Sequence, residues 1–295
     1  MRLDSAQLNA FATVIDEGSF ERAAAALHVT RSAVSQRVKL LEERVGQVLV
    51  RRATPCAPTE AGQALYRHAR EVALSEADAL ATLGGGQHAS TRLALGVNAD
   101  SLATWFPHAM AQAAEGQSIT FDIHVEDQDH SANLLREGRV MAAVTADPQP
   151  VQGCKVLPLG TLRYRALASP AFLQRHFAQG VNAATLAQAP MLVFNRKDAL
   201  QARFVGRITR RKLTPPVHWL PEANAFVMAS RAGLGWGMTP DPMVQHDLKA
   251  GTLVELIPGK PVDVPLYWQY WRLNVQALHR MTEAVQQAAA LTLLR

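Results

Sequence analysis

Apolar residues recur at helical spacing along the first part of the chain, which predicts helices rather than strands. Gly18 and Gly46 stand where two of these patterns end, and Ser19 and Thr30 stand where new ones begin. Glycine is the usual residue after the last turn of a helix, and Ser or Thr is a favoured N-cap. The spacing therefore predicts three helices within residues 1–58.

A longer helical pattern follows over 59–83, with Thr59 as its cap and apolar residues on one side. Three consecutive glycines at 84–86 stop this helix, because their backbone entropy is too costly to lose. We interpret 59–90 as a linker helix followed by a hinge.

From Thr91 the pattern changes to alternating strands and helices, which is typical of an α/β domain. Its first half is expected to form strands over 93–97, 119–125 and 140–145 and helices over 102–114 and 131–136. Its second half is expected to form strands over 164–168, 191–194, 217–220 and 236–238, a returning strand at 267–271 and a closing helix at 274–293. We expect one domain over 91–295, with one lobe of 91–162 and 269–295 and a second of 163–268. A cleft between such lobes is a typical ligand site.

The third predicted helix has two unlike faces. Its apolar stripe consists of Val34, Val38, Leu41 and Val45. Its polar side consists of Ser32, Ser35, Gln36, Lys39 and Glu43. Such a polar face fits the major groove of DNA, where Gln36 can pair with adenine and Ser35 with several base edges. Arg31, Arg37 and Lys39 are placed to reach phosphates, which position a protein without reading sequence. The alternative is an ordinary amphipathic surface helix.

This N-terminal segment resembles that of LysR-type transcription regulators. The matching stretches are 11–15, 18–20, 23–24, Leu27, 30–38, 40–42, Gly46, Leu49, 51–52 and 58–62. The resemblance implies a mixed fold: an all-α winged helix-turn-helix domain over 1–58, a long linker and dimerisation helix within 59–90, and a two-lobed α/β effector domain like that of periplasmic binding proteins. It also implies a homodimer that assembles into a homotetramer on double-stranded promoter DNA.

By the same resemblance, residues 47–58 form the wing, where Arg51 and Arg52 would contact phosphate. The alternative for these two arginines is a solvated basic pair. Val50 departs from the Phe that many members of the family carry, at a position that serves packing.

Within the family, the chain resembles the ArgP/LysG subgroup over 97–105, over 125–130 and at the wing entry 46–50. That subgroup senses lysine or arginine and controls the export of basic amino acids. The resemblance therefore implies a basic amino acid as the small-molecule effector.

Residues at the strand ends of the effector domain favour a cationic ligand independently. Asp100 and Ser101 lie where the first strand turns into a helix, whose free N–H groups suit a carboxylate while Asp100 suits an ammonium group. Trp105 is one turn further on, where it could wall an aliphatic stem. The candidate effector residues are Asn98, Asp100, Ser101, Trp105, Glu126, Asp127, Thr145, Asp147 and Asp198.

Each candidate has a structural alternative. The aspartates and Ser101 are also common helix caps and turn residues, and a tryptophan such as Trp105 is more often a core residue than a ligand wall. Of Glu126, Asp127 and Asp129, we expect only one or two to face the cleft.

The net charge of the chain excludes few classes of function. The net charge is +5 and the isoelectric point about 9.5, yet the first 90 residues carry ten basic and ten acidic residues. The argument for DNA binding therefore depends on where charges lie rather than on their total. The basic run 196–212 is either a solvated helix face or a contact to DNA or to an acidic neighbouring subunit.

Other functions find little support in the sequence. Cys56 and Cys154 lack the spacing of a zinc site, a redox pair or a disulfide framework, and no metal or cofactor is expected. No nucleophile elbow or phosphate loop points to an enzyme. The start of the chain has no signal-peptide pattern and no apolar run spans a bilayer, so we expect a cytoplasmic protein without membrane contact. The alternatives are a LysR-type regulator with a different effector and an architectural nucleoid protein, against which the long α/β remainder argues.

Overall fold

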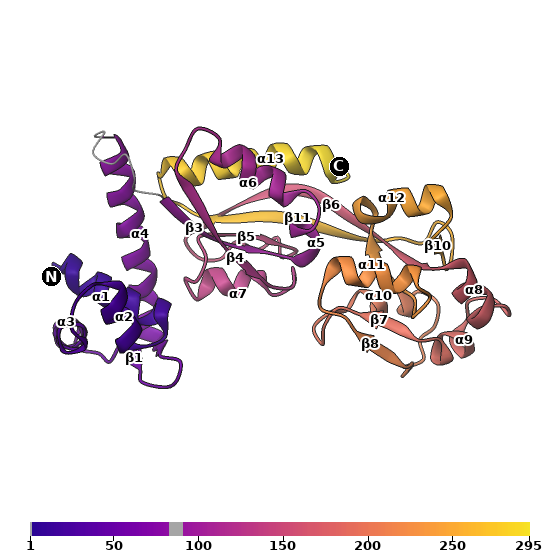
Figure 1. Cartoon of the computed structure of the whole chain (residues 1–295), viewed down its shortest axis with the longest axis horizontal. Coiled ribbons are helices and arrows are strands. Elements are labelled where there is room, and N and C mark those ends of the chain that lie inside the picture. Colours follow the sequence, from indigo (N-terminus) through magenta and orange to yellow (C-terminus); the bar gives the residue numbers. More distant parts are fainter. Residues whose placement is uncertain (1, 83–90) are drawn as a thin grey trace.

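The structure is a computed structural model that describes residues 2–82 and 91–295. The stop expected at glycines 84–86 lies outside the described residues. Figure 1 shows a small helical domain joined by one long helix to two α/β lobes. Within the described residues, no helix combines the length and apolarity that crossing a membrane requires.

Three short helices form the N-terminal domain. They are α1 (Ser5–Glu17), α2 (Phe20–Ala26) and α3 (Arg31–Val45). Gly18 ends α1 in the left-handed region at φ 62°, and the Ser19 hydroxyl caps α2 by accepting from the backbone N–H groups of Glu21 and Arg22. Thr30 caps α3 in the same way. The helix boundaries expected from these residues are confirmed.

A two-stranded wing follows α3 and packs on it. Its strands β1 (Val50–Arg51) and β2 (Ala57–Pro58) pair antiparallel. The Glu42 carboxylate on α3 accepts from the backbone N–H groups of Leu49 at 2.8 Å and Val50 at 3.3 Å, which fixes the start of the wing. Val50 is buried, as expected of a packing position.

The long helix α4 (Glu60–Thr82) begins directly after the wing. Thr59 caps it, since its hydroxyl accepts from Gly62 N–H at 3.0 Å. Gly62 is needed there because a Cβ at this position would lie 2.1 Å from the Leu49 carbonyl oxygen. On the other side, Tyr66 and Arg70 of α4 both donate to Asp16 at the end of α1, so α4 and the helical domain are bonded together.

One seven-stranded sheet runs through the rest of the chain, in the order β10–β6–β11–β5–β3–β4 with β9 paired to β6. Its strands are β3 (Thr91–Val97), β4 (Ile119–Val125), β5 (Ala142–Thr145), β6 (Cys154–Ala168), β9 (Gly237–Pro240), β10 (Val254–Glu255) and β11 (Val262–Trp271). A separate parallel pair in the second lobe comprises β7 (Met191–Val193) and β8 (Val217–Trp219). The helices are α5 (Ala99–Leu102), α6 (Phe106–Ala114), α7 (Ser131–Arg136), α8 (Pro170–His176), α9 (Ala183–Gln188), α10 (Leu200–Gly206), α11 (Ala223–Arg231), α12 (Asp241–Ala250) and α13 (Gln276–Thr292).

The two longest strands, β6 and β11, cross from one lobe to the other as an antiparallel pair, and both start earlier than the sequence suggested. The expected strands at 164–168 and 267–271 are only their ends. The earlier part of each strand was not predicted, because Pro and Gly are unfavourable inside a strand. The residues concerned are Pro158, Gly160 and Pro265. The pair is irregular between Leu266 and Tyr267, opposite the Pro158–Gly160 segment. The expected lobe boundaries at 162/163 and 268/269 both fall inside these strands.

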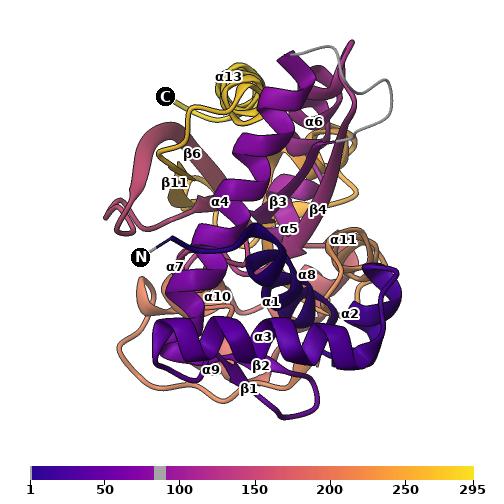
Figure 2. The same cartoon turned by 90° about the vertical axis from the view of Figure 1, so that its left-hand side faces the viewer.

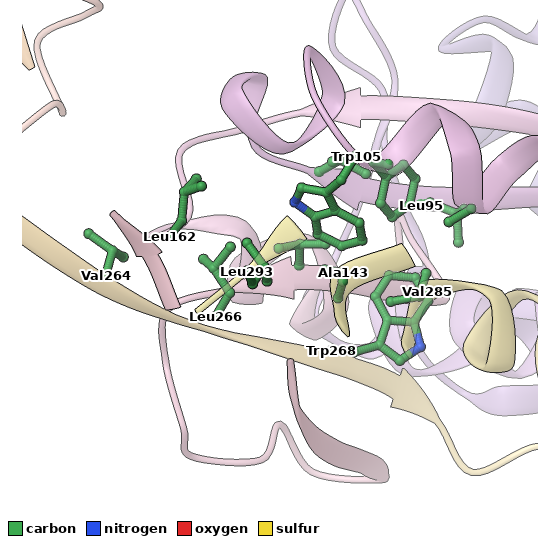
Figure 3. Packing of buried hydrophobic residues seen from close by; sticks show 14 of the residues in the cluster. Leu95, Trp105, Ala143, Leu162, Val264, Leu266, Trp268, Val285 and Leu293 are labelled. Carbon is green, nitrogen blue, oxygen red and sulfur yellow. The ribbon is translucent and has the colours of Figure 1, made fainter. Parts of the chain in front are cut away.

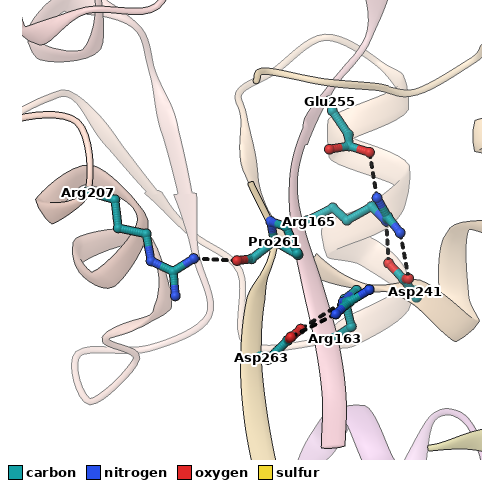
Figure 4. Close-up of polar contacts among 7 residues, drawn as sticks. All are labelled: Arg163, Arg165, Arg207, Asp241, Glu255, Pro261 and Asp263. Atoms are coloured by element: carbon teal, nitrogen blue, oxygen red, sulfur yellow. Dashed lines mark hydrogen bonds and ion pairs between the residues drawn. The ribbon is translucent and has the colours of Figure 1, made fainter. Parts of the chain in front are cut away.

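Ion pairs brace the crossing (Figure 4). Arg165 of β6 binds Asp241 at 2.7 Å and Glu255 at 2.5 Å, and Arg163 forms two 2.8 Å contacts with Asp263 of β11. These contacts fix the two strands and the start of α12 in one arrangement.

We expected one helix over 102–114, and this prediction was wrong. The segment contains the end of α5 and the whole of α6, with a break between them. Pro107 lies in the first turn of α6, where its missing N–H is tolerated, and it cannot continue a helix from before. Between the two helices Trp105 enters the core of the first lobe, where Leu95, Ala143 and Trp268 are also buried (Figure 3).

Candidate DNA interface and effector pocket

The polar side of α3 faces outward. Ser32, Gln36 and Lys39 are exposed, and Ser35 and Arg37 are half-buried, while Val34, Val38 and Leu41 are fully buried beneath them. Figure 2 looks onto α3, which lies at the front of the molecule above the β1–β2 hairpin. This is the arrangement that a helix needs in order to enter a groove.

The charged candidates of this surface differ in their present contacts. Arg31 pairs with Glu21 at 2.9 Å and Lys39 with Glu43 at 3.5 Å, all with side chains more than half exposed. In the wing, Arg51 donates to the Pro58 carbonyl and Arg52 lies 5.1 Å from the centre of the Phe20 ring. Both wing arginines are exposed. Exposed pairs of this kind are weak, so these cations remain available to phosphates.

A pocket that is partly open to solvent lies between the two lobes. Four carboxylates line it: Asp100, Glu126, Asp127 and Asp198. Its other polar lining residues are Asn98, Gln128, Asn195 and Thr239. Its larger apolar lining residues are Val125, Phe194, Leu200, Phe226, Met238 and Met243. The pocket therefore combines apolar walls with a high density of negative charge.

Asp100 is the carboxylate most strongly perturbed by its position. Burial raises its pKa to about 6, with further raising contributions from the carboxylates of Asp198 and Asp127. The Tyr164 hydroxyl opposes this shift by donating to the Asp100 carboxylate at 2.6 Å. A cation in the pocket would restore the ionised form of Asp100.

Asp127 and Asp198 are held by backbone groups rather than by cations. Burial raises the pKa of Asp127, against the lowering effect of the Asp129 N–H that donates to it at 2.9 Å. Asp198 accepts from the N–H groups of Phe194 at 3.1 Å and of Leu200, the first residue of α10, at 3.0 Å. Asp198 therefore lines the pocket and also bonds to the first residue of α10, and its contact with an effector stays a prediction.

Two ion pairs bridge the lobes beside the pocket. Lys197 of the second lobe lies 2.9 Å from each carboxylate oxygen of Glu126, and Arg203 lies 2.6 Å from Asp129. Partial burial raises the pKa of Glu126, but the hydrogen bond and charge of Lys197 outweigh it and leave the pKa lowered. Lys197 and Arg203 of the basic run 196–212 therefore pair with acids of the same chain, although both side chains remain partly exposed to solvent.

Four sequence candidates do not line the pocket. Ser101 and Trp105 are fully buried, and the Trp105 ring packs edge-on against Phe106, so it is a core residue and not a wall of the pocket. Thr145 is also buried, and it supports the pocket indirectly. Its hydroxyl donates to the backbone carbonyl of the lining residue Gln128 at 3.2 Å. Asp147 lies 3.7 Å from Arg136 and forms a turn with Gln149, outside the cleft.

Buried polar atoms in the lining have no partner among residues 2–82 and 91–295. These are Nδ2 and Oδ1 of Asn98 and Oγ1 of Thr239. Leaving such groups unsatisfied costs about 1–3 kcal/mol each. A polar ligand that supplies a donor and an acceptor would remove this cost.

The sequence did not identify Tyr164, Lys197 or Asn195 as members of the site. Tyr164 belongs to an alternating strand pattern and Lys197 to a basic run, so neither has a local signal. Only the fold brings them to the strand ends. Among the residues that the structure describes, no cluster of three His, Cys, Asp or Glu side chains is arranged to hold a metal ion.

Comparison with known families gives two matches that together cover most of the chain. The family described as bacterial regulatory helix-turn-helix protein, lysR family, matches residues 5–63. The family described as LysR substrate binding domain matches residues 86–291.

Individual proteins match over nearly the whole length. The lysine export transcriptional regulatory protein LysG of Corynebacterium glutamicum is 43% identical over 288 residues, which are 96% of this chain and 97% of that protein. The crystal structure of ArgP from Mycobacterium tuberculosis has 48% identity and a TM-score of 0.88, over 100% of this chain and 99% of that one. Full-length LysG from Corynebacterium glutamicum with bound effector Arg has 41% identity and a TM-score of 0.81, over 99% of this chain and 100% of that one.

Proposed function

This chain belongs to the LysR family of transcriptional regulators, of the LysG and ArgP kind, and we propose that arginine or lysine binds its interlobe pocket and thereby changes its binding to promoter DNA. The similar LysG structure that holds arginine supports a basic amino acid as the effector. The regulator of lysine export among the relatives supports a gene for basic amino-acid export as the target.

The single observation that carries the proposal is the charge of the pocket. Asp100, Asp127 and Asp198 all line it, and none of the three forms an ion pair with Lys or Arg in the described part of the chain. Three neighbouring carboxylates repel one another in a half-buried site, so a cationic side chain is bound and an anionic one is excluded. The unpartnered Asn98 and Thr239 suit the polar backbone groups of an amino acid.

We assign recognition of the DNA base sequence to α3 and the wing. Gln36, Ser35 and Ser32 would contact base edges, and the basic residues of α3 and the wing would contact phosphates. Those basic residues are Arg31, Arg37, Lys39, Arg51 and Arg52. The proposed functional units are 1–58 for DNA, 59–90 for linkage and dimerisation, and 91–295 for the effector.

The proposed assembly is a homodimer through α4 that pairs into a tetramer on DNA. In that assembly a second copy of α4 would cover Leu80, which is 54% exposed near the end of the helix. Light scattering of the purified chain tests this directly, with a monomer as the contradicting result.

The proposed function as a whole is tested by DNA binding with and without effector. A labelled promoter fragment is titrated with the full chain by fluorescence anisotropy, in buffer alone and with saturating arginine, lysine or glutamate. Arginine or lysine is expected to shift the dissociation constant about fivefold or more, as typical of allosteric coupling, and glutamate is expected to leave it unchanged. Equal constants in all four conditions contradict the proposal.

A further inference from the structure

Arg67 bonds the linker helix α4 to three segments of the first lobe. Its guanidinium donates to the backbone carbonyls of Gln152 at 3.1 Å and Leu135 at 3.3 Å. It also lies 5.4 Å from the centre of the Trp271 ring, within the range of a cation–π contact. One side chain therefore fixes the position of α4 on the effector domain.

An arginine at position 67 is energetically unfavourable if the contact serves only to hold the structure together. Its Nε is buried and has no hydrogen-bond partner among the residues that the structure describes. Burying an unsatisfied polar group is unfavourable, and apolar side chains of similar volume are often as stable in such positions. The directional bonds of the guanidinium, rather than its packing, distinguish it from methionine or leucine.

Helix α7 connects this contact to the effector pocket. The loop that contains Asp127 directly precedes α7. The backbone carbonyl of Asp127 accepts hydrogen bonds from the backbone N–H of Ser131 at 2.9 Å and from its hydroxyl at 3.0 Å. At its other end the Leu135 carbonyl accepts from Arg67. Between the two lies a rod of six residues, about 9 Å long at the usual helical rise, most of which is buried. Figure 1 shows α7 on the same side of the sheet as the lower part of α4.

The pocket end of this rod is attached to the second lobe. Glu126 and Asp129, which flank Asp127, are the residues paired with Lys197 and Arg203 across the cleft. A change in lobe position or in these ion pairs therefore acts on the loop that begins α7. Because protein interiors are close-packed, a buried helix transmits such a shift rather than absorbing it.

The contact around Arg67 has little space to absorb a shift. A Cβ at Gly138 would lie 3.3 Å from the Cβ of Arg67, so α4 touches the chain directly after α7. On its far side α4 is bonded to Asp16 of α1 through Tyr66 and Arg70. These contacts form a continuous route from α7 through α4 to the DNA-binding domain within the same chain.

We infer that Arg67 is the positioning residue that couples the effector pocket to the DNA-binding domain in cis, by way of α7. This inference rests on the proposed function of the pocket. It requires no change of subunit packing, and it assigns the coupling to one hydrogen-bonded side chain.

The test compares Arg67→Met with Arg280→Met in the full chain. Arg280 is also half-buried and also donates to a backbone carbonyl of another element, that of Glu115 at 2.8 Å, but it lies outside the route through α7. Arginine affinity is measured by calorimetry, and DNA affinity by anisotropy with and without saturating arginine. The readout is the ratio of the two DNA dissociation constants.

For Arg67→Met, the affinity for arginine and the affinity for DNA without arginine are each expected to stay within about threefold of those of the unmodified chain. The ratio of its DNA dissociation constants with and without arginine is expected to fall to about 1. Arg280→Met is expected to keep the unmodified ratio. Arg67→Lys, whose N–H donors all lie on one nitrogen, is expected to give an intermediate ratio, and it serves as the measured variant if Arg67→Met does not fold. An unmodified ratio in the Arg67 variants overturns the inference. An unmodified chain that binds no arginine, or whose own ratio is 1, instead contradicts the proposed function.

Discussion

The Lys197 ammonium group of the second lobe lies 2.9 Å from both carboxylate oxygens of Glu126 in the first lobe. Glu126 lines the pocket, so a cation of the protein itself already occupies one of the four carboxylates that would attract a cationic effector. The pair bridges the two lobes beside the pocket and at the same time reduces the charge that the effector meets.

Replacing Lys197 by Gln therefore strengthens arginine binding, by about threefold, because it frees the charge of Glu126 at a partly exposed site. Stability changes little, since the Lys197 side chain is 50% exposed and such pairs contribute about 1 kcal/mol or less. Calorimetric titration at low salt measures the affinity.

Arg203→Gln is the matched control for this variant, because it breaks the other interlobe pair but frees Asp129, which does not line the pocket. A gain in arginine affinity that is equal in both variants would mean that looser lobes, not the freed charge, cause it. Weaker binding by Lys197→Gln would contradict the competition.

Asp100→Asn is expected to weaken arginine binding at least tenfold and to raise the stability of the ligand-free chain. The amide keeps an acceptor for the Tyr164 hydroxyl but removes a charge whose burial is unfavourable. A pKa near 6 instead of 3.8 corresponds to a gain on the order of 1–3 kcal/mol at neutral pH. Thermal unfolding and calorimetry measure the two effects, and a variant that loses both affinity and stability would show that Asp100 serves structure alone.

The pH dependence of binding follows from the same carboxyl. Arginine binds the ionised form, so its affinity is expected to fall as the pH is lowered through about 6, by up to about tenfold per pH unit. The stability of the ligand-free chain moves the opposite way. Because the folded pKa of Asp100 lies above the unfolded one, its neutral form adds stability at low pH that is lost as the pH rises through about 6. Equal dissociation constants at pH 5 and 7.5 would exclude Asp100 from cation binding.

Gln36→Ala is expected to reduce affinity for the specific promoter about tenfold or more, the cost of losing one bidentate base contact, and to leave affinity for random DNA unchanged. Arginine binding should be unaffected, since Gln36 is exposed on α3, far from the pocket in the sequence and in the fold. Gln245→Ala, an exposed glutamine on α12, is the control. A parallel loss on both DNAs would assign Gln36 to phosphate binding instead of base reading.

The sequence determined the helical domain well and the cleft only in part. Gly18, Ser19 and Thr30 are local signals, and each ends or caps a helix where the pattern placed it. The crossing strands β6 and β11 were recognised only at their ends, because their prolines and Gly160 are tolerated by an irregularity that depends on both strands together.

The acids of the pocket were found because they follow strand ends, a rule that links sequence position to one edge of a sheet. Trp105 was assigned to the pocket wall by helical spacing, but the helix breaks before Pro107 and the ring turns into the core. Tyr164 and Lys197 reach the cleft from distant segments, and no periodicity predicts a contact of that kind.

We propose that the charge of the interlobe pocket selects its ligand. The most direct measurement is a calorimetric titration of the full chain with L-arginine and with L-citrulline, which has nearly the same shape but a neutral side chain. Arginine is expected to bind at least about a hundredfold more tightly, as the loss of a charge-assisted contact in a half-buried site implies. Equal affinity for the two amino acids would contradict the account.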